Sequence, residues 1–293
     1  GEIGGNKVLL RDGDTRVLLD FGMSFSLKGQ YYSAPFLLPR SERSLLEFGI
    51  LPPLQGVYKF DKSEHEIDGV FLSHSHMDHA AYISFLKREI PVHCGETTKT
   101  ILEALGRMKA GDFEFNVRDV EFRTFRTGDK ITVGSLELEP IHVDHSVPGS
   151  YGFIIHTSSG AVVYTGDFRV HGTRPEMTEE FVEKARDAGP IAVIPEGTNM
   201  TNAEVSSELE VERKLTQIVR QASGLVLADF GRADIDRLRS FYRAAKRNDR
   251  ALVVTSRQAY LLKELGRDPH LKVPKLDDES VRIFRKEKKH YYT

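Results

Sequence analysis

The chain has 293 residues, of which 40% are hydrophobic, and carries 41 Lys and Arg residues against 43 Asp and Glu residues. This length predicts one large domain or two smaller ones. The nearly balanced charge excludes a general basic surface, so any site for a polyanion must be local.

Other features of the composition bear on location. The single cysteine, Cys94, excludes an internal disulfide and favours the cytoplasm as the location. No apolar run approaches the ~20 residues of a membrane span, and no signal peptide is visible, so we expect no membrane contact. Gly1 stands first and no capping element closes the last residues. We therefore expect both ends of the chain to be truncated.

The chain begins with a predicted β-hairpin, whose strands at 7–11 and 16–20 flank an Asp-Gly-Asp turn at 12–14. Asp20 ends the second strand, where a carboxylate either caps a turn or accepts a hydrogen bond from a metal-ligating histidine. Spacing does not decide between these roles. Residues 23–64 form a long insert with four prolines and an amphipathic stretch at 41–48. We expect this insert to be mainly a packed surface loop.

Three histidines and an aspartate then occur within six residues: His74, His76, Asp78 and His79. They follow the apolar run 70–72, which is typical of a buried strand. His74 and His76 project together if the chain is extended, whereas Asp78 and His79 face a second point from the first turn of a helix at 80–87. A lone core histidine is usually structural, but this density predicts a metal site. The donors favour Zn²⁺, with Mn²⁺ harder to exclude, and the two directions suit two ions.

The middle of the chain supplies further candidate ligands. A helix is predicted at 97–108, and strands are predicted at 91–94, 120–125, 130–133 and 136–141. The last strand leads to His142 and His145, which chemistry alone does not separate as ligands. A second hairpin, at 151–157 and 161–164, ends in Thr-Gly-Asp. We expect the carboxylate of Asp167 to point toward the same site and to bridge two ions.

A helix at 176–187 and a buried strand at 191–194 lead to Glu196. From about residue 205 the pattern changes to predicted helices at 207–222, 234–246 and 257–265, with strands at 225–229 and 251–255. Alternating strands and helices predict a parallel sheet with crossover helices, and hence a second domain.

These motifs resemble the metallo-β-lactamase superfamily, and within it the β-CASP nucleases of the ribonuclease J type. The resemblance rests on Gly-Glu-Ile-Gly-Gly-Asn at 1–6, Asp20, the histidine run, His145 in His-Ser-Val-Pro-Gly, Asp167 in Thr-Gly-Asp-Phe-Arg, and Glu196 in Glu-Gly-Thr. It implies an α/β fold, in which an αββα metallo-β-lactamase sandwich at 1–204 is followed by a partial inserted β-CASP α/β domain at 205–293.

The resemblance also implies roles for individual residues. His145, not His142, would join His74 and His76 at one zinc ion, Asp78 and His79 would hold the other, and Asp167 would be shared. Asp20 would orient a ligand, and Asp78, Asp167 and Glu196 would serve catalysis. The family supplies further histidines after the insert, whereas this chain stops at Thr293 inside it. The chain is therefore either a fragment or lacks part of the family's catalytic machinery.

The implied function is hydrolysis of RNA phosphodiester bonds by a water molecule that two metal ions activate, from a 5′ end, internally, or both. The expected partner is single-stranded RNA and the expected assembly is a homodimer. Arg169 and His171 are candidate phosphate contacts. Seven basic residues at 232–250 are either a solvated helix face or a nucleic-acid contact. Two alternatives stay open: a metallo-hydrolase of small esters or thioesters, and a non-catalytic nucleic-acid-binding fragment.

Overall fold

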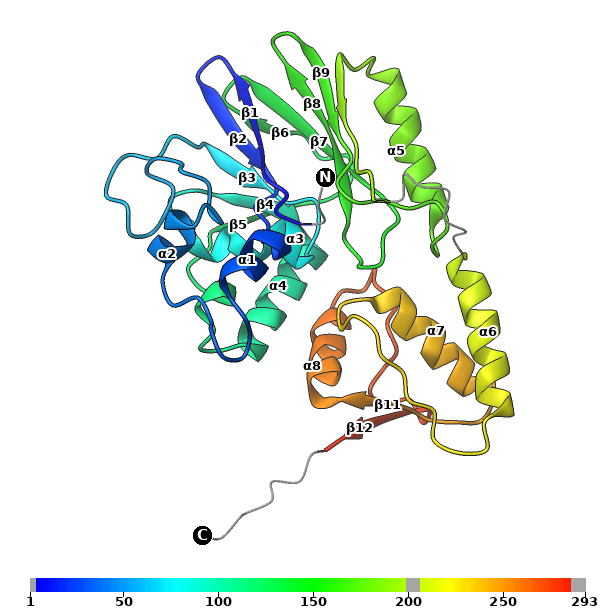
Figure 1. Ribbon diagram of the computed structural model, residues 1–293. Coiled ribbons are helices and arrows are strands. Elements are labelled where there is room, and N and C mark those ends of the chain that lie inside the picture. Colours follow the sequence, from blue (N-terminus) through cyan, green and yellow to red (C-terminus); the bar gives the residue numbers. More distant parts are fainter. Residues whose placement is uncertain (1–3, 199–205, 286–293) are drawn as a thin grey trace, which may run out of the picture. The chain divides into compact units, whose positions relative to one another are not determined.

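The computed structural model describes residues 4–198 and 206–285 (Figure 1). The chain forms two compact units. The first consists of Gly1–Val170 and Arg174–Ala203, and the second of His171–Thr173 and Glu204–Thr293. Among the residues described, no helix has the length and apolarity that crossing a lipid bilayer requires.

The first unit contains two five-stranded sheets. The first sheet has the order β1-β2-β3-β4-β5. Its strands are β1 (Val8–Asp12), β2 (Thr15–Leu19), β3 (Gly69–Phe71), β4 (Val92–Gly95) and β5 (Phe122–Phe125). The predicted hairpin is confirmed as the antiparallel pair β1 and β2, and the other neighbours run parallel.

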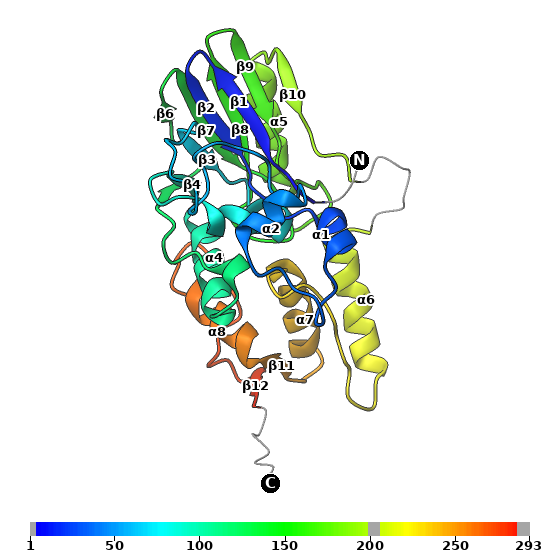
Figure 2. The same cartoon turned by 60° about the vertical axis from the view of Figure 1, so that its left-hand side comes forward.

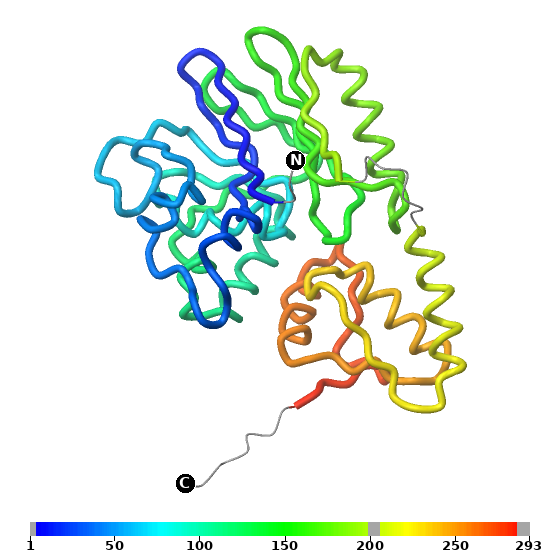
Figure 3. The backbone as a smooth tube through the Cα atoms, in the orientation of Figure 1, coloured from blue at the N-terminus to red at the C-terminus, as the bar shows by residue number. Residues whose placement is uncertain are grey.

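The second sheet has the order β10-β9-β8-β7-β6. Its strands are β6 (Ile131–Val133), β7 (Leu136–His142), β8 (Tyr151–Thr157), β9 (Gly160–Tyr164) and β10 (Ala192–Ile194). Strands β6 to β9 are antiparallel, and β10 pairs in parallel with β9. Figure 3 shows the chain passing from the first sheet to the second.

The two sheets pack face to face, and helices cover their outer faces (Figure 2). Alternate side chains of each strand point to opposite faces of the sheet and therefore pack into different hydrophobic cores. Phe71 packs between the sheets with Phe153, whereas Val70 packs outward against Tyr82 and its neighbours. Helices α2 (Glu42–Glu47) and α4 (Glu96–Met108) contribute to the outer core of the first sheet, and α5 (Pro175–Asp187) covers the second. The predicted αββα sandwich is confirmed.

The predicted helix at 80–87 is wrong. The chain forms one α-helical turn, α3 (Met77–Ala80), and then a 3₁₀ turn (Ala81–Phe85). The backbone N–H of Tyr82 donates to the carbonyl of Phe21 and not to the carbonyl four residues before it, and the carbonyl of His79 accepts from the N–H of Phe21. These bonds replace the pattern that would continue an α-helix.

Two further expectations for the first unit need correction. The insert contains a helix that we did not predict, α1 (Phe25–Tyr31), in addition to α2 within the amphipathic stretch. The strand predicted as buried at 191–194 is an edge strand, β10, and its Val193 is exposed.

The second unit contains α6 (Glu208–Gln221), α7 (Ile235–Lys246), β11 (Leu252–Thr255), α8 (Ser256–Leu265) and β12 (Val281–Phe284). Strands β11 and β12 pair in parallel, around a small core that includes Leu238, Val254 and Leu262. The strand predicted at 225–229 is wrong, because these residues have no regular structure and Leu225 and Leu227 are exposed. We did not predict β12, whose residues pair with residues of β11 that lie 29 positions earlier in the sequence.

Candidate metal centre

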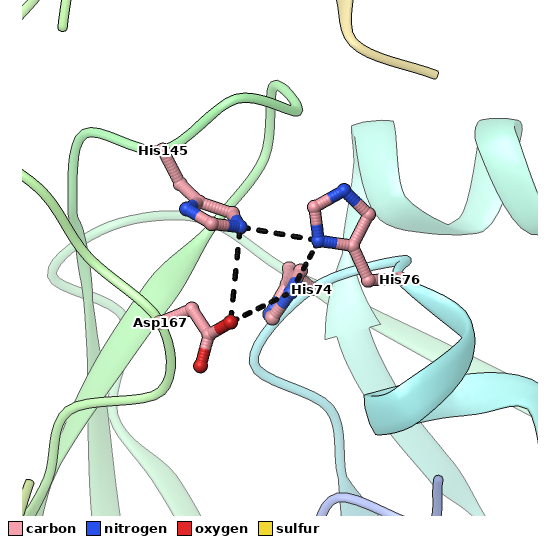
Figure 4. A group of neighbouring side chains, drawn as sticks. All are labelled: His74, His76, His145 and Asp167. Atoms are coloured by element: carbon pink, nitrogen blue, oxygen red, sulfur yellow. Dashed lines mark hydrogen bonds and ion pairs between the residues drawn. The ribbon is translucent and has the colours of Figure 1, made fainter. Parts of the chain in front are cut away.

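Four side chains from three loops converge at one end of the two sheets (Figure 4). His74 and His76 lie between β3 and α3, His145 lies between β7 and β8, and Asp167 follows β9. The turn before Asp167 packs closely on Ser73. Gly166 has a φ of 54°, and a Cβ atom there would lie 2.6 Å from Cβ of Ser73. Only glycine permits this approach.

The three imidazoles face one another through specific nitrogens. Nε2 of His74 and Nε2 of His145 lie 3.0 and 3.1 Å from Nδ1 of His76. Both Nε2 atoms lie 4.0 Å from Oδ2 of Asp167. Four atoms bound tetrahedrally to zinc at ~2.0–2.1 Å lie about 3.3 Å apart. The spacing of this first ligand group (His74, His76, His145 and Asp167) therefore fits a single small divalent ion.

A second ligand group consists of Asp78, His79 and Asp167. Nε2 of His79 lies 3.2 Å from Oδ1 of Asp167 and 3.7 Å from Oδ2 of Asp78. Asp167 thus presents Oδ2 to the first group and Oδ1 to the second. A carboxylate in this position can bridge two ions.

Burial sets the protonation of the first group. It lowers the pKa of His74, of His76 and of His145, whose pKa falls to about 3. Neighbouring imidazoles lower the pKa of His74 and His145 further. These rings are therefore neutral near pH 7 and have lone pairs for a cation. For Asp167, burial acts to raise the pKa, but the hydrogen bond and charge of His79 lower it overall.

His79 behaves differently. Burial opposes its protonation, but the carboxylates of Asp20 and Asp167 raise its pKa to about 10. A proton and a cation therefore compete for Nε2 of this ring. The same carboxylates that favour the proton favour any cation at that position.

Asp20 is fully buried and accepts four hydrogen bonds. Its Oδ2 accepts a hydrogen bond from Nδ1 of His79 at 2.7 Å, and it also accepts hydrogen bonds from the hydroxyls of Ser73 and Tyr164. Nδ1 of His74 lies 2.9 Å from the same Ser73 hydroxyl. The single hydroxyl hydrogen of Ser73 goes to Asp20, so His74 must be the donor to Ser73. Asp20 therefore contacts one ligand directly and another through Ser73.

His142 lies outside both ligand groups. Strand β7 extends through it, its backbone pairs with Tyr151, and its ring stacks on that tyrosine with centroids 4.2 Å apart. His145 lies beyond the strand, where the chain can turn its side chain toward His76. The structure therefore places His145, and not His142, with the other candidate ligands.

The other candidate residues belong to neither ligand group. Glu196 accepts hydrogen bonds from the backbone of Phe168 and Thr198, and so holds the loop that follows Asp167. The guanidinium of Arg169 lies 3.4 Å from Asp144. His171 belongs to the second compact unit.

The basic residues of α7 are mostly engaged within the second unit. Arg237 pairs with Glu208, and Arg243 and Arg247 both pair with Glu212. Arg250 donates to three backbone carbonyls, and Lys246 pairs with Asp278. These contacts favour a structural role for this helix face over a nucleic-acid contact.

From the sequence we assigned no role to three residues of the centre: Asn6, Ser73 and Tyr164. Nδ2 of Asn6 lies 3.0 Å from Nε2 of His79. Ser73 and Tyr164 precede the ligands His74 and Asp167 closely in the chain. Their closeness to the ligands in the sequence was the only hint of a role. Serine and tyrosine are so common that this hint alone could not identify them.

Comparisons with known proteins support the fold. The family model described as "Beta-lactamase superfamily domain" matches residues 51–214. The chain is similar to Ribonuclease J of Thermus thermophilus, with 27% identity over 271 residues, covering 88% of this chain and 43% of the relative. For Ribonuclease J of Sinorhizobium meliloti the identity is 26% over 213 residues, which cover 71% of this chain and 37% of that relative. The chain spans about two fifths of the length of these relatives.

Among solved structures, the chain is similar to a protein of unknown function from Enterococcus faecalis V583. The TM-score is 0.76 and the identity is 24%, covering 97% of this chain and 71% of the other. At this level of identity the likeness supports the fold alone.

Proposed function

The chain belongs to the beta-lactamase superfamily, and from this premise we propose that it is a metal-dependent ribonuclease that hydrolyses phosphodiester bonds of single-stranded RNA. The similarity to Ribonuclease J supports the substrate class. The observation that carries the proposal is the position of Asp167, whose two carboxylate oxygens face two different ligand groups.

The donors fit two divalent ions. His74, His76 and His145 would hold one, Asp78 and His79 would hold the other, and Asp167 would be shared. Imidazole and carboxylate donors suit zinc best, with manganese as the second choice. When bound, two such ions lower the pKa of a water molecule and neutralise the charge that develops on the phosphate.

The protein residues prepare this chemistry in three ways. Burial keeps the imidazoles of His74 and His145 unprotonated. Asp20 fixes the rings of His79 and His74 through hydrogen bonds that leave both Nε2 atoms directed at the site. Asp78 is part-buried, and its Oδ2 lies 3.7 Å from Nε2 of His79. It is the carboxylate best placed to accept a proton from the attacking water.

The finer assignments are part of the same proposal. We assign residues 1–204 to the metallo-β-lactamase domain and residues 205–293 to a partial β-CASP domain. The expected location is the cytoplasm. Arg169 is proposed as a phosphate contact because its charge acts on His145, whereas Glu196 is proposed to support the Asp167 loop.

The test compares two substrates: a 5′-labelled single-stranded RNA and a small activated ester. Protein stripped with a chelator should cleave RNA only after zinc or manganese is restored, and Asp167→Asn should abolish the cleavage. His142→Ala is the matched control, because this histidine is nearby but outside both ligand groups, and its activity should stay near that of the wild type. Hydrolysis of the ester without cleavage of RNA would contradict the proposal.

A further inference from the structure

We infer that Asp144 is a positioning residue of the candidate metal centre. It ties the loop that carries His145 to the loop that carries Asp167, and so fixes the separation of these two ligands. The inference rests on the proposed function, because it concerns the metal ions of that reaction. It adds to the centre a residue that belongs to neither ligand group.

The second sheet alone does not set the distance between His145 and Asp167. His145 follows β7 and Asp167 follows β9, and β8 lies between these two strands. Both strands are antiparallel to β8, so their carboxyl ends lie at the same edge of the sheet, about 10 Å apart at two strand spacings. Nε2 of His145 nevertheless lies 4.0 Å from Oδ2 of Asp167, and Figure 4 shows the two side chains facing each other. The two loops must therefore bend toward each other past the end of β8.

Asp144 joins the two loops through its backbone. Its carbonyl accepts a hydrogen bond at 2.8 Å from the N–H of Arg169, two residues after Asp167. Its own N–H donates to Oγ1 of Thr178 at 3.0 Å, and the same Oγ1 donates to the carbonyl of Arg169 at 2.9 Å. One hydroxyl on α5 thus accepts from one loop and donates to the other. These bonds lie one residue from His145 and two residues from Asp167, so they limit the movement of both ligands.

The carboxylate of Asp144 adds a second set of contacts, and only 3% of the residue is exposed. Oδ1 lies 3.4 Å from Nε and from a terminal nitrogen of the Arg169 guanidinium. Oδ2 accepts a hydrogen bond at 3.2 Å from the backbone N–H of Arg174, at the start of α5. The buried charge of Asp144 therefore has its cation on the other loop. Separating the loops is costly, because it would leave this charge without its partner.

A role confined to anchoring α5 is the alternative, because Thr178 and Arg174 both belong to the start of this helix. The two roles differ in their effect on a metal ion. A residue that only anchors α5 contributes to the stability of the fold. A residue that sets the ligand separation also changes the affinity for the ion that His145 and Asp167 share, under conditions in which the protein is fully folded.

The experiment measures metal binding and stability on the same variants. Metal-free proteins are titrated with zinc by calorimetry at a temperature well below unfolding, and with Co²⁺ while its visible absorption is recorded. Asp144→Asn removes the charge with little change of shape. Thr178→Val removes the bridging hydroxyl, and Thr178→Ser keeps it. Melting temperatures are measured without metal, and cleavage of RNA is measured for the zinc-loaded wild type.

Thr15→Val is the matched control. Thr15 is also a buried threonine, and its Oγ1 accepts a hydrogen bond at 2.9 Å from the backbone N–H of Ser135, in the turn between β6 and β7. It begins β2, at the opposite end of this strand from Asp20. The control should lower the melting temperature and leave zinc affinity and cobalt absorption unchanged.

Asp144→Asn and Thr178→Val should each weaken one zinc-binding event by about 10-fold or more, as the loss of a contact that supports a metal ligand typically does. The visible absorption of bound Co²⁺ should change in both variants, because it depends on the arrangement of the ligands around the ion. Thr178→Ser should restore the zinc affinity and the absorption of the wild type.

Zinc affinity and cobalt absorption equal to those of the wild type in both Asp144→Asn and Thr178→Val would overturn the positioning role, whatever their melting temperatures. An equal loss of affinity in Thr15→Val would overturn it as well, since the effect would then follow general stability. In either case, cleavage of RNA by the wild type would leave the proposed function standing.

The opposite combination is also distinguishable. Variants that behave as expected, with a wild type that binds zinc but does not cleave RNA, would reject the proposed function and support the positioning role. A wild type that binds no zinc would reject both.

Discussion

Oδ2 of Asp20 lies 2.7 Å from Nδ1 of His79, and the carboxylate is fully buried. Asp20 has a φ of 59°, a left-handed conformation that aspartate tolerates better than most residues. The conformation turns the chain at the end of β2, where the carboxylate accepts hydrogen bonds from the loop after β3, from α3 and from β9. One residue thus connects the fold of the first sheet to the orientation of the ligands.

Replacing Asp20 with Asn should weaken binding of metal ions. The amide cannot accept from all four donors, and it does not fix the His79 ring with Nε2 toward the site. Loss of such a supporting hydrogen bond typically lowers metal affinity or activity about 10- to 100-fold. Isothermal titration with zinc measures the effect.

Asp12→Asn is the matched control for this variant. Asp12 is also a buried carboxylate, but it accepts hydrogen bonds from the backbone and hydroxyl of Ser158. Its replacement should lower the melting temperature and leave zinc affinity unchanged. An equal loss of zinc affinity in both variants would mean that Asp20 acts only through general stability.

His145→Ala and His142→Ala should differ sharply in zinc affinity. The first removes a nitrogen that lies 3.1 Å from Nδ1 of His76, whereas the second removes a ring that stacks on Tyr151. Titration should show loss of one zinc-binding event in His145→Ala and none in His142→Ala. The reverse result would assign the ligand to His142 and contradict the geometry of the β7–β8 loop.

The metal-free protein should lose stability as the pH falls below about 6.5, in part because of His93. Burial lowers the pKa of His93 to about 4, so the unfolded chain binds a proton at this residue that the folded protein does not. The free energy of unfolding should therefore fall by up to about 1.4 kcal/mol per pH unit between pH 6.5 and 4 from this residue alone.

His93→Phe tests the assignment. The ring stacks on Phe71 with centroids 4.4 Å apart, and its Nε2 has no hydrogen-bond partner among the described residues. Phenylalanine should keep the packing. It should also lower the number of protons that the chain takes up on unfolding by close to one, as measured from the pH dependence of urea unfolding. The exposed His156, replaced by Gln, provides the comparison. Identical pH profiles for the wild type and His93→Phe would contradict the prediction.

In the second unit, Arg243→Gln combined with Arg247→Gln should reduce stability and leave RNA binding unchanged. Both guanidiniums pair with Glu212, whose side chain is buried, and their loss leaves that carboxylate without its cations. A destabilisation of about 1–3 kcal/mol is expected, since the arginines themselves are partly exposed. Thermal unfolding measures it.

Lys214→Gln is the control for the double variant, because its pair with Glu210 is exposed and should contribute less than about 1 kcal/mol. If the double variant instead kept its stability and bound RNA with a weaker salt dependence, α7 would be a nucleic-acid contact and the structural role would be wrong.

The sequence predicted the elements whose determinants are local. The β1–β2 hairpin follows from its Asp-Gly-Asp turn, and the convergence of His74, His76 and Asp167 follows from their positions just beyond strand ends. Other features depend on distant partners. The helix after His76 stops early because Phe21 bonds to the backbone of His79 and Tyr82, and β12 forms only because β11 offers an edge. The role of Asp20 was open because its four donors come from three other segments.

The residues around His142 and His145 also could not show which of the two is the candidate ligand. The answer depends on where β7 ends, and β7 is set by its pairing with β8. The basic face of α7 was ambiguous for a similar reason. Its partners Glu208 and Glu212 lie on α6, where no spacing along α7 itself could reveal them.

The most direct test of the central claim is the number of metal ions per chain, measured by elemental analysis of carefully dialysed protein. The account predicts two divalent ions per wild-type chain and their loss in Asp167→Ala, since this carboxylate faces both ligand groups. A wild-type chain that holds no ion after exposure to zinc would contradict the metal centre, and with it the proposed reaction.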